Sequence, residues 1–186
     1  MRDEPEDANL FPPVPKSGHT EELVDHYWGS INYVFSLIRA SEIKAGLILS
    51  FYGILLNFTY QQLEVFLEAA STQVLLYLPL VLWVLATAAS IYFCVRCFMP
   101  RIEGKFDKNV FFFKDVITKF GDIKTFSSTF YKISLDEREL FDQLGQQIYI
   151  NSKIAALKFK FVNRAIRMLA VSLGLLFILI ITFSII

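Results

Sequence analysis

Long apolar runs alternate with polar stretches along this chain. Three of the runs, 45–63, 69–95 and 168–186, contain no charged side chain. A helix needs roughly 20 apolar residues to cross a bilayer, and each run meets or approaches that length. Soluble helices keep a polar face, but VLLYLPLVLWVLATAASIYFCV (74–95) has none. The pattern therefore predicts three transmembrane helices, the second of them at about 74–95.

Helical periodicity also precedes the first and third spans. Apolar residues recur there at helical spacing: Leu23, Tyr27, Ile31, Val34, Phe35 and Ile38 in the first case, and Leu140, Leu144, Ile148, Ile154 and Leu157 in the second. Each pattern continues into its span without a break, and both helices approach the membrane from the same side. The predicted fold is an all-α membrane protein with three transmembrane helices. The helices of spans one and three extend into the cytoplasm and pack as a parallel bundle.

The start of the second long helix has a sequence signature. Ser134 and Glu137 fit a capping box, in which the serine caps the helix and the glutamate bonds back to it. Between the second span and this signature, segment 101–133 has no clear period. Its consecutive phenylalanines, Phe111–Phe113, are too concentrated to leave exposed, so we expect them to pack in a core. Contact with the membrane interface is the alternative.

The points at which the two long helices enter the membrane suggest which of their residues lie side by side. If Lys44 and Arg167 both mark the membrane edge, Glu42 lies near the level of Arg164. That register is a hypothesis, and it predicts an ion pair between Glu42 and Arg164.

Composition and charge support the membrane assignment and orient the chain. The 186 residues are 54% hydrophobic and 19% charged, with a mean hydropathy of +0.46. Residues 96–167 hold 14 basic and 8 acidic side chains, a net charge of +6, whereas residues 1–44 hold 4 and 8, a net charge of −4. The connection 61–73 has two glutamates and no Lys or Arg. Positive residues stay on the cytoplasmic side, so the N-terminus and 96–167 are predicted to be cytoplasmic.

Four regions follow from these patterns. We predict a disordered acidic and proline-rich tail (1–19), a cytoplasmic helix that continues into spans one and two (20–95), a cytoplasmic helical region (96–167) and span three (168–186).

Recognisable catalytic chemistry is missing from the sequence. No phosphate-binding loop, dinucleotide-binding fingerprint, zinc-protease motif or nucleophile elbow is found. Cys94 and Cys97 form a C-x-x-C pair, but zinc needs about four ligands and only His19 and His26 are available elsewhere. We therefore expect no metal, no enzyme and no nucleic-acid partner. The spans also lack ionisable residues, which disfavours an ion-coupled pump.

One face of the first span carries small residues. Gly46, Ser50, Gly53 and Asn57 are spaced i, i+4, i+7 and i+11 and so lie on one side of a helix. Helices associate in lipid through close approach at small residues and polar contacts. We expect another span, from this chain or from a second copy, to pack against this small-residue face.

Three segments resemble a known family in order and position. They are SEIKAGLILSFYGILL (41–56), NVFFFKDV (109–116) and ELFDQLGQQIYINSKIAALKFKFVNRAI (139–166). They resemble, respectively, the Ala-Asp-x-Lys-Ala, Asn-x-x-Phe-Phe and Gln-x-x-x-x-Ile-Tyr-x-x-Ser-x-Ile-x-x-x-Lys-Tyr signatures of Pycsar-type transmembrane effectors. Those proteins are the membrane-disrupting arm of cyclic-nucleotide anti-phage defence. Ser41 and Glu42 stand in place of the commoner Ala-Asp, and phenylalanine replaces the last tyrosine.

The resemblance implies a function and partners. It implies a nucleotide-responsive effector of the bacterial inner membrane that assembles with copies of itself and disrupts the bilayer, which is abortive infection. The cyclic nucleotide would come from a neighbouring synthase. The alternative is a membrane adaptor that docks a cytoplasmic partner through its helices.

A nucleotide would need cations for its phosphates and an aromatic face for its base. The candidate ligand-binding residues are Trp28, Arg39, Lys44, Tyr149, Lys158 and Arg164. Positive-inside topology and lipid headgroups also explain the basic residues, and core packing also explains the aromatic ones.

Overall fold

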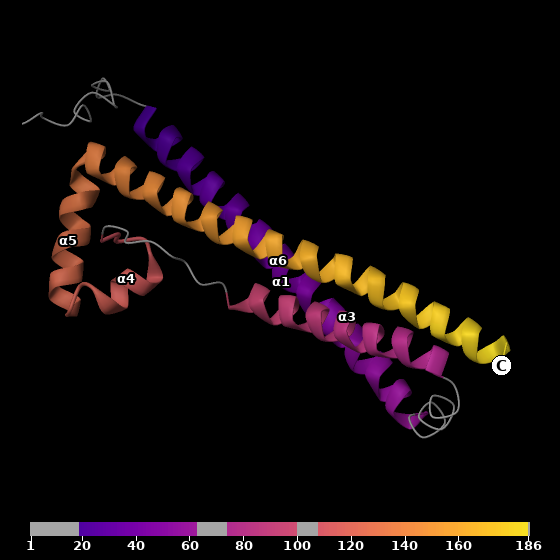
Figure 1. Cartoon of the computed structure of the whole chain (residues 1–186). Coiled ribbons are helices and arrows are strands. Elements are labelled where there is room, and N and C mark those ends of the chain that lie inside the picture. The colour runs from indigo at the N-terminus through magenta and orange to yellow at the C-terminus, as the bar shows by residue number, and fades with distance from the viewer. Residues whose placement is uncertain (1–18, 63–73, 100–107, 186) are drawn as a thin grey trace, which may run out of the picture. The chain divides into compact units, whose positions relative to one another are not determined.

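The computed structural model describes residues 19–62, 74–99 and 108–185. The predicted tail 1–19 lies outside these residues except for His19. In the described ranges the chain forms helices and turns and no strand (Figure 1). The helices are α1 (His19–Gln61), α3 (Val74–Phe98), α4 (Phe113–Thr118), α5 (Ile123–Leu135) and α6 (Glu137–Ile185).

Three of these helices are long and apolar enough to cross a membrane, which confirms the predicted all-α fold with three spans. Helices α1 and α6 have 43 and 49 residues. At 1.5 Å per residue each is about twice as long as the roughly 30 Å hydrocarbon core of a bilayer. The polar stretch that precedes each span therefore belongs to the same continuous helix, as the periodicity predicts.

The described residues divide into two compact units. The first unit contains residues 19–34 and 108–152, and the second contains residues 35–62, 74–99 and 153–185. Helices α1 and α6 contribute to both units, whereas α4 and α5 belong to the first and α3 to the second.

In the first unit, α4 and α5 fold around a small aromatic core. Val110, Phe120 and Ile133 are buried there, and Phe120 meets Phe126 edge to face with ring centroids 5.3 Å apart. Such perpendicular pairs are the arrangement that the charge distribution of aromatic rings favours. Gly121 connects the two helices with φ +79°, a conformation that favours glycine.

Helices α1 and α6 also meet in the first unit. Tyr27 of α1 lies 5.3 Å from Phe141 of α6, measured between ring centroids. Trp28 packs edge-on against Phe111 of the loop before α4, with 5.8 Å between centroids.

The phenylalanine cluster is only partly packed, so the expectation for it is wrong in part. Phe111 and Phe112 are half-buried, but 81% of Phe113 is exposed. Phe112 occupies the N-cap position of α4 and Phe113 is its first residue, and successive helical side chains point about 100° apart. Three consecutive rings at a helix start therefore cannot all face one core.

The predicted capping box at Ser134 is also wrong. Helix α5 continues through Leu135, and the Ser134 hydroxyl donates to the Phe130 carbonyl at 2.8 Å. The break falls at Asp136, whose carboxylate accepts the Glu139 amide at 3.1 Å and caps α6. Asp136 and Glu139 have the same spacing as the predicted pair, so the cap lies two residues later than expected.

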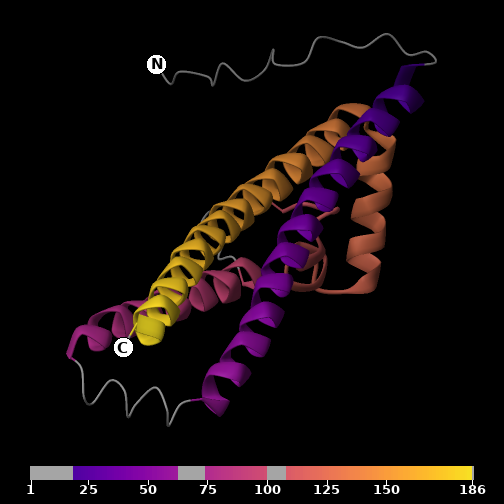
Figure 2. The same cartoon turned by 90° about the vertical axis from the view of Figure 1, so that its right-hand side faces the viewer.

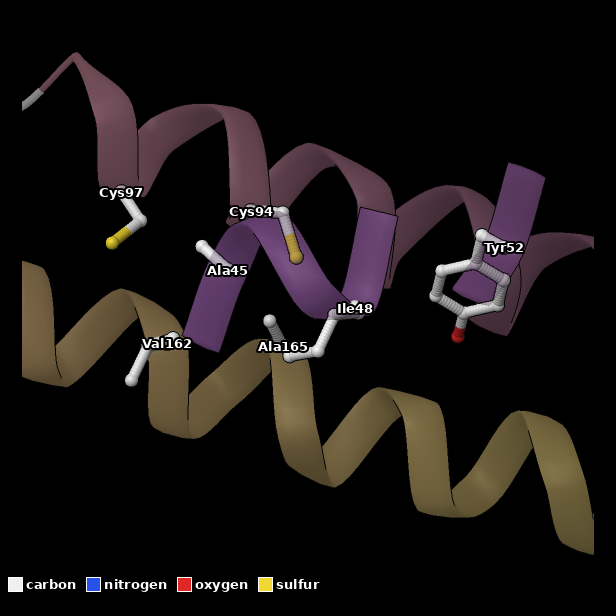
Figure 3. Close-up of a cluster of buried hydrophobic side chains, with 7 residues drawn as sticks. All are labelled: Ala45, Ile48, Tyr52, Cys94, Cys97, Val162 and Ala165. Atoms are coloured by element: carbon white, nitrogen blue, oxygen red, sulfur yellow. The ribbon is translucent and has the colours of Figure 1, made fainter. Parts of the chain in front are cut away.

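In the second unit, α3 packs against both α1 and α6 (Figures 1 and 2). Close to the end of α3, the core contains Ala45, Ile48 and Tyr52 of α1, Cys94 and Cys97 of α3, and Val162 and Ala165 of α6 (Figure 3). Trp83 and Leu179 form a second cluster, about three helical turns earlier in α3 than Cys94. Residues later in α3 thus contact earlier ones in α6, and the two helices are antiparallel.

The hypothesised register between α1 and α6 is wrong by six residues. Glu42 pairs with Lys158, with 2.7 Å between the ammonium nitrogen and a carboxylate oxygen, and not with Arg164. Arg164 lies over the Phe93 ring instead, 5.8 Å from its centroid. Long basic side chains reach toward the membrane surface from different depths, so Lys44 and Arg167 need not mark the same level.

Candidate functional site

A buried lysine joins the three helices of the second unit. Lys158 of α6 is 4% exposed, and its ammonium donates to the Glu42 carboxylate at 2.7 Å and to the Cys97 carbonyl at 2.9 Å. Glu42 belongs to α1 and Cys97 to α3. We call Ser41, Glu42, Cys97 and Lys158 the junction cluster.

The position of the lysine suits its charge. The Cys97 carbonyl is among the last four of α3, which have no partner within the helix, and the end of a helix carries partial negative charge. Removing an ammonium from water is expensive unless it is paired and hydrogen-bonded. The Lys158 ammonium donates to a carboxylate and to a carbonyl at a helix end, so two of its three N–H groups have partners inside the protein.

Small side chains allow the helices to approach closely at this point. Ser41 is fully buried, and its hydroxyl donates to the Leu37 carbonyl of its own helix at 3.0 Å. The Cys97 thiol lies 3.7 Å from the carbonyl oxygens of both Ser41 and Lys158. A thiol in contact with the backbones of two neighbouring helices leaves no room for a larger residue.

A second polar cluster, in the first unit, consists of Asn109, Asp115 and Gln143, and we call it the loop cluster. The Asn109 amide donates to the Gln143 carbonyl at 2.7 Å, and its oxygen accepts the Phe111 amide at 2.8 Å. The Gln143 side chain accepts the Val110 amide at 3.0 Å and donates to the Lys108 carbonyl at 3.3 Å. The Asp115 carboxylate accepts the backbone N–H of Asn109 at 3.2 Å and pairs with Lys119. These bonds attach the loop before α4 to α6.

Two further polar atoms lie on the same helix in the first unit. Gln147 and Asn151 follow Gln143 at i+4 and i+8 and are 4% and 2% exposed. The Gln147 side-chain oxygen and the Asn151 side-chain nitrogen have no hydrogen-bond partner. Buried polar groups are seldom left unpaired, so this acceptor and donor call for an explanation.

The predicted ligand-binding residues do not all lie in one unit. Trp28 and Tyr149 are exposed residues of the first unit. The four basic residues belong to the second unit: Arg39, Lys44, Lys158 and Arg164. Lys158 is buried in the junction cluster, while Lys44 is exposed and lies 6.0 Å from the centroid of the Phe159 ring.

The small-residue face points away from the core of the second unit. Ser50, Gly53 and Asn57 are exposed, and a Cβ added at Gly53 would meet no atom within 4 Å. At Gly46 such a Cβ would be 4.0 Å from Phe98. At 100° per residue this face lies about 150° from the buried side of α1.

The two cysteines are free thiols, both fully buried in α3. Among the residues that the structure describes, no group of three or more His, Cys, Asp or Glu side chains is placed to hold a metal ion.

The comparison with protein families decides the assignment. A model described as the Pycsar effector protein domain matches residues 26–185. The chain belongs to the Pycsar effector family. No curated protein and no solved structure matches it.

The geometry gives the Pycsar effector segments a physical meaning. Glu42 of the first segment bonds Lys158 of the third, and Asn109 of the second bonds Gln143 of the third. Each segment therefore supplies one partner of a polar contact with another of the three segments.

The sequence does not predict these pairings, although all three segments are recognisable in it. It suggests Lys158 as a phosphate ligand and indicates no role for Gln143 and Asn109. A lysine among apolar residues on the inward side of a helix was the available signal, because such a lysine needs a buried partner.

Proposed function

We propose that this Pycsar effector is a non-enzymatic, nucleotide-responsive membrane protein of the bacterial inner membrane. In this proposal it assembles with copies of itself during phage infection and disrupts the bilayer. The N-terminus and residues 96–167 lie in the cytoplasm. Three helices suited to crossing a membrane support the membrane assignment, and the family supports the link to cyclic-nucleotide defence.

The observation that carries the proposal is the junction cluster. It contains the charged pair that connects two family segments, and it joins all three long helices beside the apolar core of the spans. Glu42 is 40% exposed at its side chain, so water reaches one end of the pair. We propose that the nucleotide signal reaches the spans through this contact.

The nucleotide remains part of the proposal, with a regulatory role and not that of a cofactor. Its proposed contacts in the first unit are Trp28 and Tyr149, and those in the second unit are Arg39, Lys44, Lys158 and Arg164. We add the unpaired oxygen of Gln147 and nitrogen of Asn151, which lie one helical turn apart on α6, because the edge of a nucleobase offers both a donor and an acceptor.

Replacing these two side chains tests that role separately from folding. Gln147→Met and Asn151→Leu remove unpaired buried polar atoms at similar volume, which is close to neutral for stability. We expect each variant to keep its unfolding midpoint and to lose at least tenfold in response to nucleotide. An unchanged response excludes these atoms as ligands.

Assembly is proposed to use the small-residue face of α1. Ser50, Gly53 and Asn57 of this face are exposed in the single chain, and close approach at glycine favours helix association in lipid. Gly53→Leu should reduce cross-linked oligomers in membranes by at least fivefold.

Gly174→Leu is the matched control for that experiment. Gly174 also lies in a span with no atom within 4 Å of an added Cβ. If both leucine variants reduce cross-linking equally, α1 has no special part in assembly.

The function itself is tested by membrane potential in living cells. Cells that carry this chain and an inducible cyclic-nucleotide synthase are monitored with a potential-sensitive dye. We expect induction of the synthase to change the potential only when the spans are intact. A constant potential under every nucleotide and phage condition would contradict the effector function and favour a docking role.

A further inference from the structure

Residues 113–124, which comprise α4, the start of α5 and the turn between them, expose apolar side chains that do not pack in the core of the first unit. We call this segment the α4–α5 turn. Phe113, Ile117 and Ile123 are 81%, 70% and 86% exposed. Phe113 and Ile117 are four residues apart and so lie on one face of α4. A hollow of about 640 Å³ adjoins Ile117 and Ile123.

Lysines surround these apolar side chains. Segment 108–132 contains five lysines and two aspartates, a net charge of +3. Lys114 and Lys124 are exposed beside the apolar residues. Both aspartates are engaged within the unit, since Asp115 pairs with Lys119 and Asp122 accepts the Thr125 amide at 2.6 Å. Apolar residues flanked by lysines are the composition of segments that lie in an anionic membrane interface.

The connection to the membrane is short. Eight residues separate Met99, just after the end of α3, from Lys108. Fully extended, they reach at most roughly 30 Å. Because α3 is a candidate membrane span, this short connection keeps Lys108 and the segment after it close to the bilayer. A soluble partner, in contrast, must diffuse to the segment.

From these observations we infer that the α4–α5 turn docks on the anionic phospholipid surface of the bilayer that holds the chain. Phe113, Ile117 and Ile123 enter the interface, and Lys114 and Lys124 contact lipid phosphates. This surface is separate from the junction cluster and from the small-residue face, so it does not depend on the proposed effector function.

The test measures how close the turn lies to lipid in the full-length protein. The chain is reconstituted at one copy per nanodisc in neutral phosphatidylcholine, or in phosphatidylcholine with phosphatidylglycerol. An environment-sensitive fluorophore is placed on Ile123→Cys, and headgroup-spin-labelled lipid is the quencher. Ser134→Cys, exposed at the other end of α5, is the matched control. Wild-type protein treated with the fluorophore corrects for reaction at the two buried native cysteines.

We expect quenching at position 123 to be at least twofold stronger than at position 134 in the anionic discs. Lys114→Gln with Lys124→Gln should remove most of that difference. Repeating the measurement with Ile117→Cys guards against a local effect of one substitution.

Three results would overturn the inference. Equal quenching at 123 and 134 means that the turn does not face lipid. Equal quenching in neutral and anionic discs means that the lysines do not bind lipid phosphates. A blue-shifted emission at 123 without quenching means that protein, such as a second copy, covers the turn.

Discussion

The junction cluster and the loop cluster both attach α6 to another part of the chain, but with different chemistry. The junction cluster uses full charges, with a lysine side chain 5% exposed and its glutamate partner 40% exposed. The loop cluster relies mainly on neutral amides, with Asn109 fully buried and Gln143 only 7% exposed. The Glu42–Lys158 contact therefore reaches water at its edge, whereas the Asn109–Gln143 contact is buried.

This difference bears on how each contact can be broken. A buried charge that loses its partner is left with a large desolvation penalty, whereas a neutral amide that loses its partner leaves a smaller one. An ion pair with one hydrated end can also separate when a nearby charge or ligand changes. We therefore assign the fixed connection to the loop cluster and the responsive one to the junction cluster.

The largest expected effect is that of removing the carboxylate from the junction cluster. Glu42→Ala leaves the buried Lys158 ammonium with a carbonyl alone and should lower the free energy of unfolding by about 3 kcal/mol, the low end for a broken buried pair because water reaches Glu42. Lys158→Met should cost less, about 1 kcal/mol, since Glu42 can then hydrate. Equilibrium unfolding in mixed micelles measures both values.

A double variant tests whether losing Glu42 costs more stability than losing Lys158 because it leaves a buried charge unpaired. Glu42→Leu combined with Lys158→Met should be more stable than Glu42→Leu alone, because it no longer buries an unpaired charge. A double variant that is less stable than either single one would show that the pair is not coupled as described.

A smaller effect is expected in the loop cluster. Asn109→Ala leaves the Gln143 carbonyl and the Phe111 amide without their partner, at a cost of about 2 kcal/mol. Protection of the α4 amides from hydrogen exchange should fall, while the membrane response to nucleotide should persist. Loss of the response with intact α4 protection would remove the distinction between the two clusters.

The smallest effect is expected within the spans. Thr87 and Ser172 share a buried hydrogen bond of 2.9 Å, and such bonds in membranes average about 0.6 kcal/mol. Thr87→Val should therefore lower the unfolding free energy by about that amount. A cost as large as that of Glu42→Ala would place the main stabilising contact inside the bilayer instead of at the junction.

The sequence predicts the helices better than it predicts their contacts. Charge-free runs and helical periodicity identify the three long helices, because length and polarity alone decide whether a segment can cross a bilayer. They do not specify register. The predicted partner of Glu42 is wrong because lysine and arginine side chains extend over more than one helical turn.

The polar clusters were harder to predict for a related reason. Asn109 and Gln143 are 34 residues apart in sequence, and no local pattern shows that their side chains meet. The exposed Phe113 is a third case. Its exposure follows from the direction in which α4 begins, which only the folded loop determines.

The most direct test of the account measures membrane potential in cells with an inducible cyclic-nucleotide synthase, using wild-type protein, Glu42→Asp and Glu42→Gln. The aspartate keeps the charge opposite Lys158, and the amide removes it. We predict that wild type and Glu42→Asp change the potential when the synthase is induced, and that Glu42→Gln gives the same potential with and without induction. A synthase-dependent change in Glu42→Gln equal to that of wild type would contradict the role of the junction cluster.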